Sequence, residues 1–140
     1  MSISAEAVDL IGDAKLMAHL ATSVDDRPHV APVWYAYDDG VLSVLTGGKK
    51  LANVRRNPRV AVSIERNDDG DAEWMVSLLG TAEIHTEPAP INEAARTVFS
   101  KYLGAPEDGG WDEYHRKFLT EEPPHPLTEI EVTSATATRF

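Results

Sequence analysis

Apolar and polar residues alternate over most of the first two thirds of the chain. Because successive side chains of a strand point to opposite faces, a period of two predicts half-buried strands. The strands predicted in this way cover 17–24, 29–37, 41–46, 59–65 and 73–86. Asp-Asp-Arg-Pro and Asp-Asp-Gly separate the first three as turns, so the pattern predicts an antiparallel meander.

Helical periodicity is clearest after Pro88 and Pro90. Apolar residues recur there at positions i, i+3, i+4, i+7, i+8 and i+11, from Ile91 to Tyr102, and the pattern ends near Gly104. Shorter helices are predicted over 2–11, 47–57 and 111–119. A final strand over 128–132, which can extend to Phe140, follows a proline-rich stop.

These elements define an α+β fold that is mostly β. Many short antiparallel strands with late helices favour a closed or nearly closed barrel, because closure removes unpaired strand edges. Gly80 within a strand predicts a bulge or a bend at a barrel corner. A length of 140 residues fits one domain, so we expect a single domain over 1–140.

Composition and charge narrow the choice of partners. The formal net charge is −10, which opposes binding to nucleic acid or to anionic lipid. The chain has no cysteine, no apolar run long enough for a membrane span and no basic N-terminal region. We therefore expect a cytoplasmic protein, and the acidic turns with few lysines fit the salt-rich cytoplasm of a halophile.

Acidic residues are absent between Asp39 and Glu65, although 23 of the 140 residues are acidic. The same stretch contains five of the thirteen basic residues, namely Lys49, Lys50, Arg55, Arg56 and Arg59. At 46–50, Thr-Gly-Gly-Lys-Lys stands where a strand ends and a helix begins, so amide, hydroxyl and ammonium groups can converge on an anion. The alternative is that these cations form only the solvated face of a surface helix.

The order of these motifs resembles the pyridoxamine 5′-phosphate oxidase-like superfamily of split β-barrels. The resemblance rests on Arg-Pro-His-Val-Ala-Pro-Val-Trp-Tyr at 27–35, Val-Leu-Ser-Val-Leu-Thr at 41–46, Gly-Gly-Lys-Lys at 47–50, Arg-Asn-Pro-Arg-Val-Ala-Val-Ser at 56–63 and Gly-Thr-Ala-Glu at 80–83. It implies an antiparallel split β-barrel with peripheral helices. It also implies a homodimer with flavin sites at the subunit interface.

The same resemblance implies the residues of the cofactor site. Thr46, Lys49 and Lys50 are expected to bind the phosphate, and Asn53 to help position the cofactor. Val30, Ala31, Pro32 and Val33 are expected to line the ribityl chain and ring. The cofactor is FMN or a deazaflavin (coenzyme F-420), which leads us to expect an oxidoreductase that transfers hydride or electrons to a small-molecule substrate.

No side chain is assigned a catalytic role, because the cofactor supplies the chemistry and the sequence has no nucleophile motif. The five histidines show no metal-ligand spacing, so no metal site is expected. His19 is interpreted as a barrel-interior residue, and His29 as a strand-end residue that can contact the ring. Trp74, Trp111, Tyr114 and Phe118 can form an aromatic wall over the cofactor from the partner subunit, but such a cluster more often packs in an interface or in the core. A non-catalytic flavin or haem carrier and a cofactor-free dimeric barrel remain the alternatives.

Overall fold

In a computed structural model, which describes residues 2–140, the chain forms one eight-stranded sheet with helices at its periphery. The strands are β1 (Ser2–Ile3), β2 (Ala18–Val24), β3 (Arg27–Val33), β4 (Ala36–Asp38), β5 (Val41–Leu45), β6 (Arg59–Asp68), β7 (Asp71–His85) and β8 (Leu127–Arg139). Seven follow the order β3-β2-β6-β7-β8-β5-β4 in antiparallel pairs, and β1 pairs in parallel with β8. The expected α+β, mostly β, split-barrel class is confirmed.

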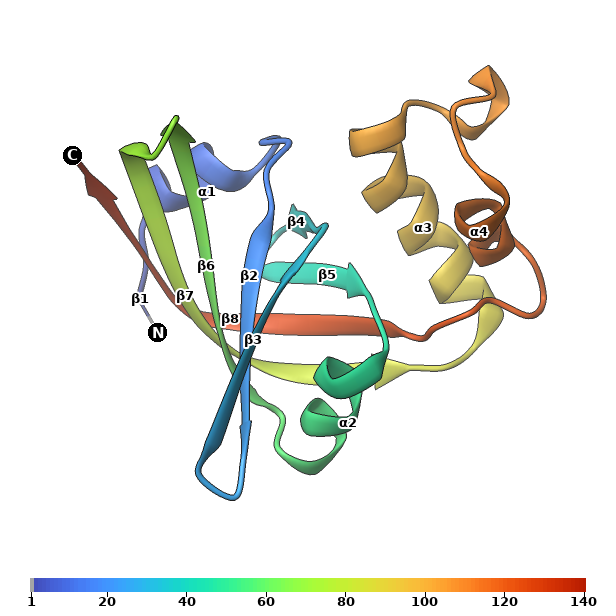
Figure 1. The fold of residues 1–140 in the computed structure, drawn as a ribbon, viewed down its shortest axis with the longest axis horizontal. Helices are drawn as coiled ribbons and strands as arrows, with labels where there is room; N and C mark the ends of the chain where they lie inside the picture. The colour runs from blue at the N-terminus through green and yellow to red at the C-terminus, as the bar shows by residue number, and fades with distance from the viewer. Residues whose placement is uncertain (1) are drawn as a thin grey trace.

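The helices lie at three places around the barrel. The α-helices are α1 (Ala5–Ile11), α2 (Gly48–Arg56), α3 (Pro88–Leu103) and α4 (Glu113–Arg116). Short 3-10 turns cover Pro106–Asp108 and Lys117–Leu119. Figure 1 shows α1 on the side of the N-terminus, α2 directly after β5, at the lower end of the barrel, and α3 and α4 together at the side farther from both termini. Within residues 2–140 no helix is long and apolar enough to cross a membrane.

Tight turns explain the hairpin registers. Asp25 and Asp26, which join β2 to β3, both have positive φ angles, as do Asp39 and Gly40 between β4 and β5. Such a pair matches the twist of a two-residue hairpin turn, and aspartate and glycine tolerate it best. The hairpins predicted at these two turns are therefore confirmed, but the three-stranded meander is wrong, because β3 and β4 lie at opposite ends of the strand order. The register shift between Leu79 and Gly80 confirms the predicted bulge.

The strand predicted over 29–37 is wrong in one respect, because the chain leaves the sheet between β3 and β4. At this break the backbone N–H of Tyr35 donates to the hydroxyl of Tyr102 (3.3 Å), so the amide is used by a side chain and not by a strand. The Tyr35 hydroxyl donates to the Ile11 carbonyl (2.7 Å), and the ring is fully buried. The buried Tyr35 therefore lies at the break that separates β3 from β4.

Two predicted helices are shorter than expected. The segment 2–11 begins as β1, and α1 starts only after Ser4, whose hydroxyl accepts from the Ala7 amide. The segment 111–119 contains one turn of α-helix, capped by Asp112, and then a 3-10 turn. In both cases a side-chain cap sets the start of the helix, and periodicity alone does not locate it.

Buried apolar residues form two clusters. One fills the barrel and includes Leu20, Tyr35, Val44, Ile64 and Trp74. The other joins α3 to the segment after it through Phe99, Trp111 and Phe118. Ile91, Ala95, Val98 and Phe99 all face inward, which confirms the apolar face predicted for this helix. Trp74 therefore lies apart from the other three residues of the predicted aromatic wall.

Candidate functional site

The end of β5 and the start of α2 form the centre of the candidate site. Gly47, the N-cap of α2, is extended and supplies no side-chain hydrogen bond, and Gly48 has a φ of +65°. The first amides of a helix lack intrahelical acceptors, so this end of α2 has free donors and a partial positive charge. Thr46 precedes it, and Lys49 and Lys50 lie in its first turn.

One hollow beside this junction, which we call the aromatic hollow, has a volume of about 240 Å³. It is lined by Met17, Pro32, Val33, Trp34, Leu45, Thr46, Lys50, Phe99, Tyr114 and His115. Its only charged or readily charged side chains are Lys50 and His115, and its lining contains no carboxylate. A protein with a net charge of −10 thus retains a carboxylate-free hollow at this position.

A second hollow, the cationic hollow, has a volume of about 520 Å³. It is lined by Val24, Asp25, Arg27, Pro28, His29, Lys49, Asn53 and Arg56. Its single carboxylate, Asp25, accepts a hydrogen bond from Arg56 at 3.2 Å, which leaves Arg27 and Lys49 in excess. The buried Nδ1 of His29 has no hydrogen-bond partner within residues 2–140, and such a group calls for a ligand or a water.

The eight predicted cofactor residues do not lie in one hollow. Thr46, Lys50, Pro32 and Val33 share the aromatic hollow, whereas Lys49 and Asn53 open on the cationic hollow. Val30 and Ala31 line neither. Val30 and Pro32 are exposed on the outer face of β3, while Val33 is buried on the inner face, as strand alternation requires. The four β3 residues therefore present two different faces.

Asn53 has a structural partner that the sequence does not reveal. It is buried, and its Nδ2 donates to Oγ1 of Thr22, also buried, at 3.0 Å. This hydrogen bond ties α2 to β2, so Asn53 fixes the helix that carries both lysines. One Nδ2–H is committed to Thr22, so a contact from Asn53 to a ligand would use the second N–H or Oδ1.

The basic stretch is not one continuous surface. Arg56 and Lys49 open on the cationic hollow, but Arg55 faces a separate hollow together with Glu121, Glu122 and His125. Arg59 is exposed at the start of β6, beyond the helix. The solvated-face interpretation therefore fits Arg55 and Arg59 better than it fits the two lysines.

Sequence reasoning missed the role of His115, which packs against Trp34. Trp34 stacks on Tyr102 on one side, with centroids 4.5 Å apart, and on His115 on the other, at 5.4 Å. The signal that could have found His115 is the Asp-x-x-His spacing at 112–115, because Asp112 caps α4 and also contacts the imidazole. Trp111 and Phe118 pack with Phe99 in the second buried cluster, as the core-packing alternative expected, and Tyr114 contacts Phe118 from a more exposed position.

His19 was wrongly assigned to the barrel interior. It pairs with Pro32 on β3 and Ser63 on β6, on the outer face of the sheet, and its Nε2 lies 3.6 Å from Glu65 Oε1. The apolar neighbours that suggested burial, Ala18 and Leu20, occupy the opposite face. A shift of one position in strand alternation accounts for the error.

A larger hollow lies elsewhere and is lined by acidic side chains. It measures about 800 Å³ and includes Asp39, Glu83, Glu129 and Glu131 without any basic side chain. A neighbouring hollow of about 510 Å³ adds Asp38, Glu93 and His85. Both are lined by carboxylates, which disfavour an anionic ligand, whereas the two hollows beside α2 carry basic side chains. Residues 2–140 contain no group of three His, Asp or Glu side chains placed to hold a metal ion.

Comparisons with known proteins agree with this fold. Among solved structures, a conserved hypothetical protein from Mycobacterium tuberculosis is 25% identical, with a TM-score of 0.77 over 97% of this chain and 84% of that one. A FAD-binding protein from Mesorhizobium loti is also 25% identical, with a TM-score of 0.63 over 96% and 93% of the two chains.

An F420 reductase is 24% identical, with a TM-score of 0.65 over 91% of this chain and 94% of that one, and supports the fold. No curated protein matches the sequence. The family model described as pyridoxamine 5′-phosphate oxidase matches residues 4–139. Since that match spans nearly the whole chain, the protein belongs to the pyridoxamine 5′-phosphate oxidase family.

Proposed function

We propose that this protein is an oxidoreductase that binds FMN or a deazaflavin beside α2. The observation that carries the proposal is the pair of cation-lined hollows on α2, which together contain six of the eight predicted cofactor residues. Their basic side chains suit an anionic ligand, and the acidic surface elsewhere directs such a ligand to this place. Flavin- and F420-related names among the structural relatives support the same cofactor class.

The residues present fit such a cofactor. The unpartnered His29 Nδ1 and the free amides at the start of α2 are polar groups that a phosphate and a heterocycle can satisfy. Lys50 and Thr46, or Lys49 and Arg27, would hold the anionic part. Pro32 and Val33 would support the ring, and the bound cofactor would supply hydride or electron transfer.

The outer face of the sheet supports a homodimer. Val30, Ala21, Ala61 and Leu79 are paired in register across β3, β2, β6 and β7 and form one apolar row. Val30 is 64% exposed and Leu79 is 56% exposed, which is unusual for large apolar side chains in one row across a sheet. A second copy of the chain would cover this row and bring its own residues toward the cofactor along β3.

The presence of two hollows beside α2, the aromatic and the cationic hollow, helps to choose between FMN and the deazaflavin. FMN has a single phosphate, whereas the deazaflavin has a phosphate and an acidic oligoglutamate tail. A longer anionic ligand can occupy both hollows, because Lys50 and Lys49 open to different sides of α2. This arrangement favours the deazaflavin.

The test is a titration of the purified chain with FMN and, separately, with oxidised deazaflavin, followed through tryptophan fluorescence. Trp34 lines the aromatic hollow and reports directly on its occupancy. Saturable binding at micromolar or lower concentration supports the proposal, and turnover with a reductant then separates an enzyme from a carrier. A Soret band after addition of haem, together with no flavin binding, would favour the haem carrier. If the chain binds neither FMN, deazaflavin nor haem, the cofactor-free barrel is favoured.

A further inference from the structure

His115 is held at the wall of the aromatic hollow by three contacts. Its ring stacks on Trp34 at 5.4 Å and meets the edge of Phe99 at 4.7 Å. Its Nδ1 lies 2.8 Å from Oδ1 of Asp112, the residue that also caps α4 by accepting from the His115 amide. These two hydrogen bonds lower the pKa of the Asp112 carboxyl, so Asp112 is a carboxylate and Nδ1 carries the hydrogen.

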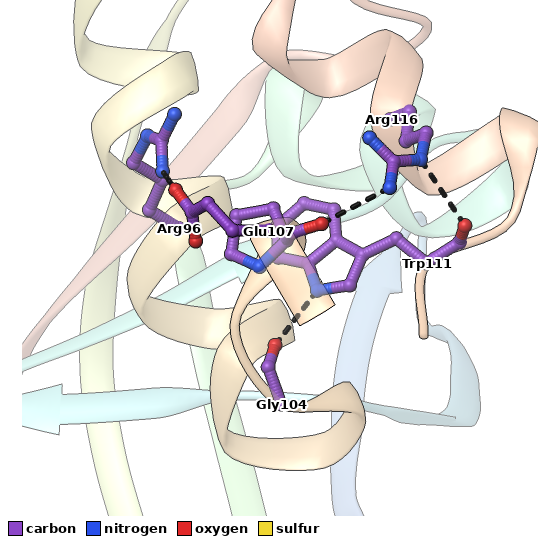
Figure 2. A network of polar contacts seen from close by, with 6 residues as sticks. Arg96, Gly104, Glu107, Trp111 and Arg116 are labelled. Atoms are coloured by element: carbon purple, nitrogen blue, oxygen red, sulfur yellow. Dashed lines mark hydrogen bonds and ion pairs between the residues drawn. The ribbon is translucent and has the colours of Figure 1, made fainter. Parts of the chain in front are cut away.

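The segment that presents His115 is itself anchored, as Figure 2 shows. Trp111 Nε1 donates to the Gly104 carbonyl at 2.8 Å, and the Arg116 guanidinium donates to the carbonyls of Trp111 and Pro106. Arg96 of α3 pairs with Glu107 at 3.1 Å. Because these hydrogen bonds hold the segment around the four-residue helix α4, the helix can keep the His115 side chain in a fixed orientation.

With Nδ1 committed to Asp112, Nε2 is the free nitrogen of the ring, and it has no hydrogen-bond partner within residues 2–140. His115 lines the same 240 Å³ hollow as Thr46 and Lys50. That volume equals the space of roughly eight water molecules. It accommodates an oxyanion and a few attached atoms, so the rest of a bound flavin would extend beyond it.

We propose that His115, together with Lys50 and Thr46, forms an oxyanion subsite in the aromatic hollow. The ligand is a phosphate or carboxylate group, which belongs either to the cofactor or to an acidic substrate. This inference rests on the proposed function, because the subsite shares Thr46 and Lys50 with the proposed cofactor site. Neutral His115 presents a lone pair at Nε2, whereas the imidazolium presents a donor, so the subsite binds anions best when His115 is protonated.

Four charged or titratable side chains lie near His115, namely Asp112, Lys50, Tyr114 and His125. Asp112 lies on the Nδ1 side of the imidazole, and Lys50 faces the same hollow from α2. Tyr114 is adjacent on α4, and burial raises the pKa of its phenol, so it stays neutral. His125 lies beyond Tyr114, with ring centroids 6.4 Å apart.

The experiment follows the His115 Cε1–H resonance of the wild-type chain by NMR at pH 6 and pH 8. Sodium sulfate is the probe, because sulfate does not titrate in this range, and the resonance is assigned by its loss in His115→Phe. We expect sulfate to shift the resonance at pH 6 and to have little effect at pH 8. Absence of a shift at pH 6 overturns the subsite.

Parallel binding measurements identify the source of the oxyanion. If it is the cofactor phosphate, His115→Phe, which keeps the stacking ring, weakens FMN binding about tenfold at pH 6 and leaves riboflavin binding unchanged. His115→Gln, whose amide can donate, restores part of the loss. If it is a substrate carboxylate, FMN binding is unchanged and sodium benzoate shifts the His115 resonance in the FMN-loaded protein.

The two proposals fail in different ways. A chain that binds neither FMN nor deazaflavin, but whose His115 responds to sulfate, refutes the proposed function and retains the subsite. A chain that binds FMN equally well with His115→Phe, and whose His115 ignores sulfate and benzoate, retains the function and refutes the subsite. Asp112→Asn is the positioning control, since asparagine preserves the cap of α4 and removes the charge behind the imidazole.

Discussion

Gly47 and His125 are in direct contact, although they lie far apart in the sequence. A methyl group on the Gly47 Cα would come within 2.5 Å of Cε1 of the His125 ring. The φ of Gly47 is −134°, which any residue can adopt, so the glycine is required by this contact and not by its backbone conformation. The proline-rich segment at 123–126 is thereby packed against the start of α2.

Replacement of Gly47 by alanine should lower the free energy of unfolding by about 1–3 kcal/mol, the usual cost of overpacking. His125→Ala in the same chain should recover most of that loss, because it removes the ring that the methyl group meets. Urea unfolding of the two single variants and the double variant gives the coupling energy. Gly48→Ala is the matched control, since Gly48 has a positive φ and open space around it, and His125→Ala should not rescue it.

Lys50→Ala should weaken FMN binding about 10- to 100-fold, the effect of losing a charge-assisted contact to phosphate. Lys49→Ala is the natural comparison, because Lys49 opens on the other hollow. With FMN, we expect the Lys49 variant to lose less than about threefold, within the range of an exposed charge pair. With oxidised deazaflavin both variants should lose affinity, and calorimetry or fluorescence titration measures each. Unchanged affinity of the Lys50 variant for both cofactors would exclude its role.

The site illustrates what sequence patterns can and cannot predict. Most strands could be predicted from the alternation of apolar and polar residues and from the turn residues. The charge distribution drew attention to α2. Both features are encoded in the local sequence. The sequence pattern did not predict that Lys49 and Lys50 line different hollows. Consecutive helical residues point in different directions, and the neighbouring elements decide which hollow each side chain enters. His115 was overlooked because its partners Trp34 and Phe99 come from distant segments. Tyr35 broke a predicted strand for the same reason, since its amide binds Tyr102.

Leu79→Lys should convert the proposed dimer to monomers. Leu79 is at one end of the apolar row and is 56% exposed, so in an interface between two copies a buried lysine would have no counter-charge. Size-exclusion chromatography with light scattering gives the mass of each species. Phe140→Lys is the control, because Phe140 is an exposed apolar residue at the chain end, outside the row. A wild-type chain that is monomeric at all concentrations would refute the interface.

Lys101 provides a prediction that is independent of any ligand. Its Nζ lies 3.5 Å from the centre of the Tyr35 ring and is buried without a hydrogen-bond partner within residues 2–140. Burial lowers the pKa of Lys101 to about 8, partly offset by the charge of Asp13. Burial also raises the pKa of Tyr102 to about 12 and that of Tyr35 further, so both phenols remain neutral below pH 10.

The sign of the pH dependence follows from proton binding. Between pH 8 and pH 10 the unfolded chain, whose lysine pKa is about 10.4, binds more protons at this position than the folded chain. The free energy of unfolding should therefore rise with pH across this window, by about 1 kcal/mol once solvent screening of a half-buried side chain is allowed for. Lys101→Met should abolish this rise, whereas Lys117→Met, at an exposed position, should retain it. Urea unfolding at pH 7.5 and pH 9.8 measures the difference, and equal slopes in the wild type and Lys101→Met would show that the ammonium group is solvated in the folded protein.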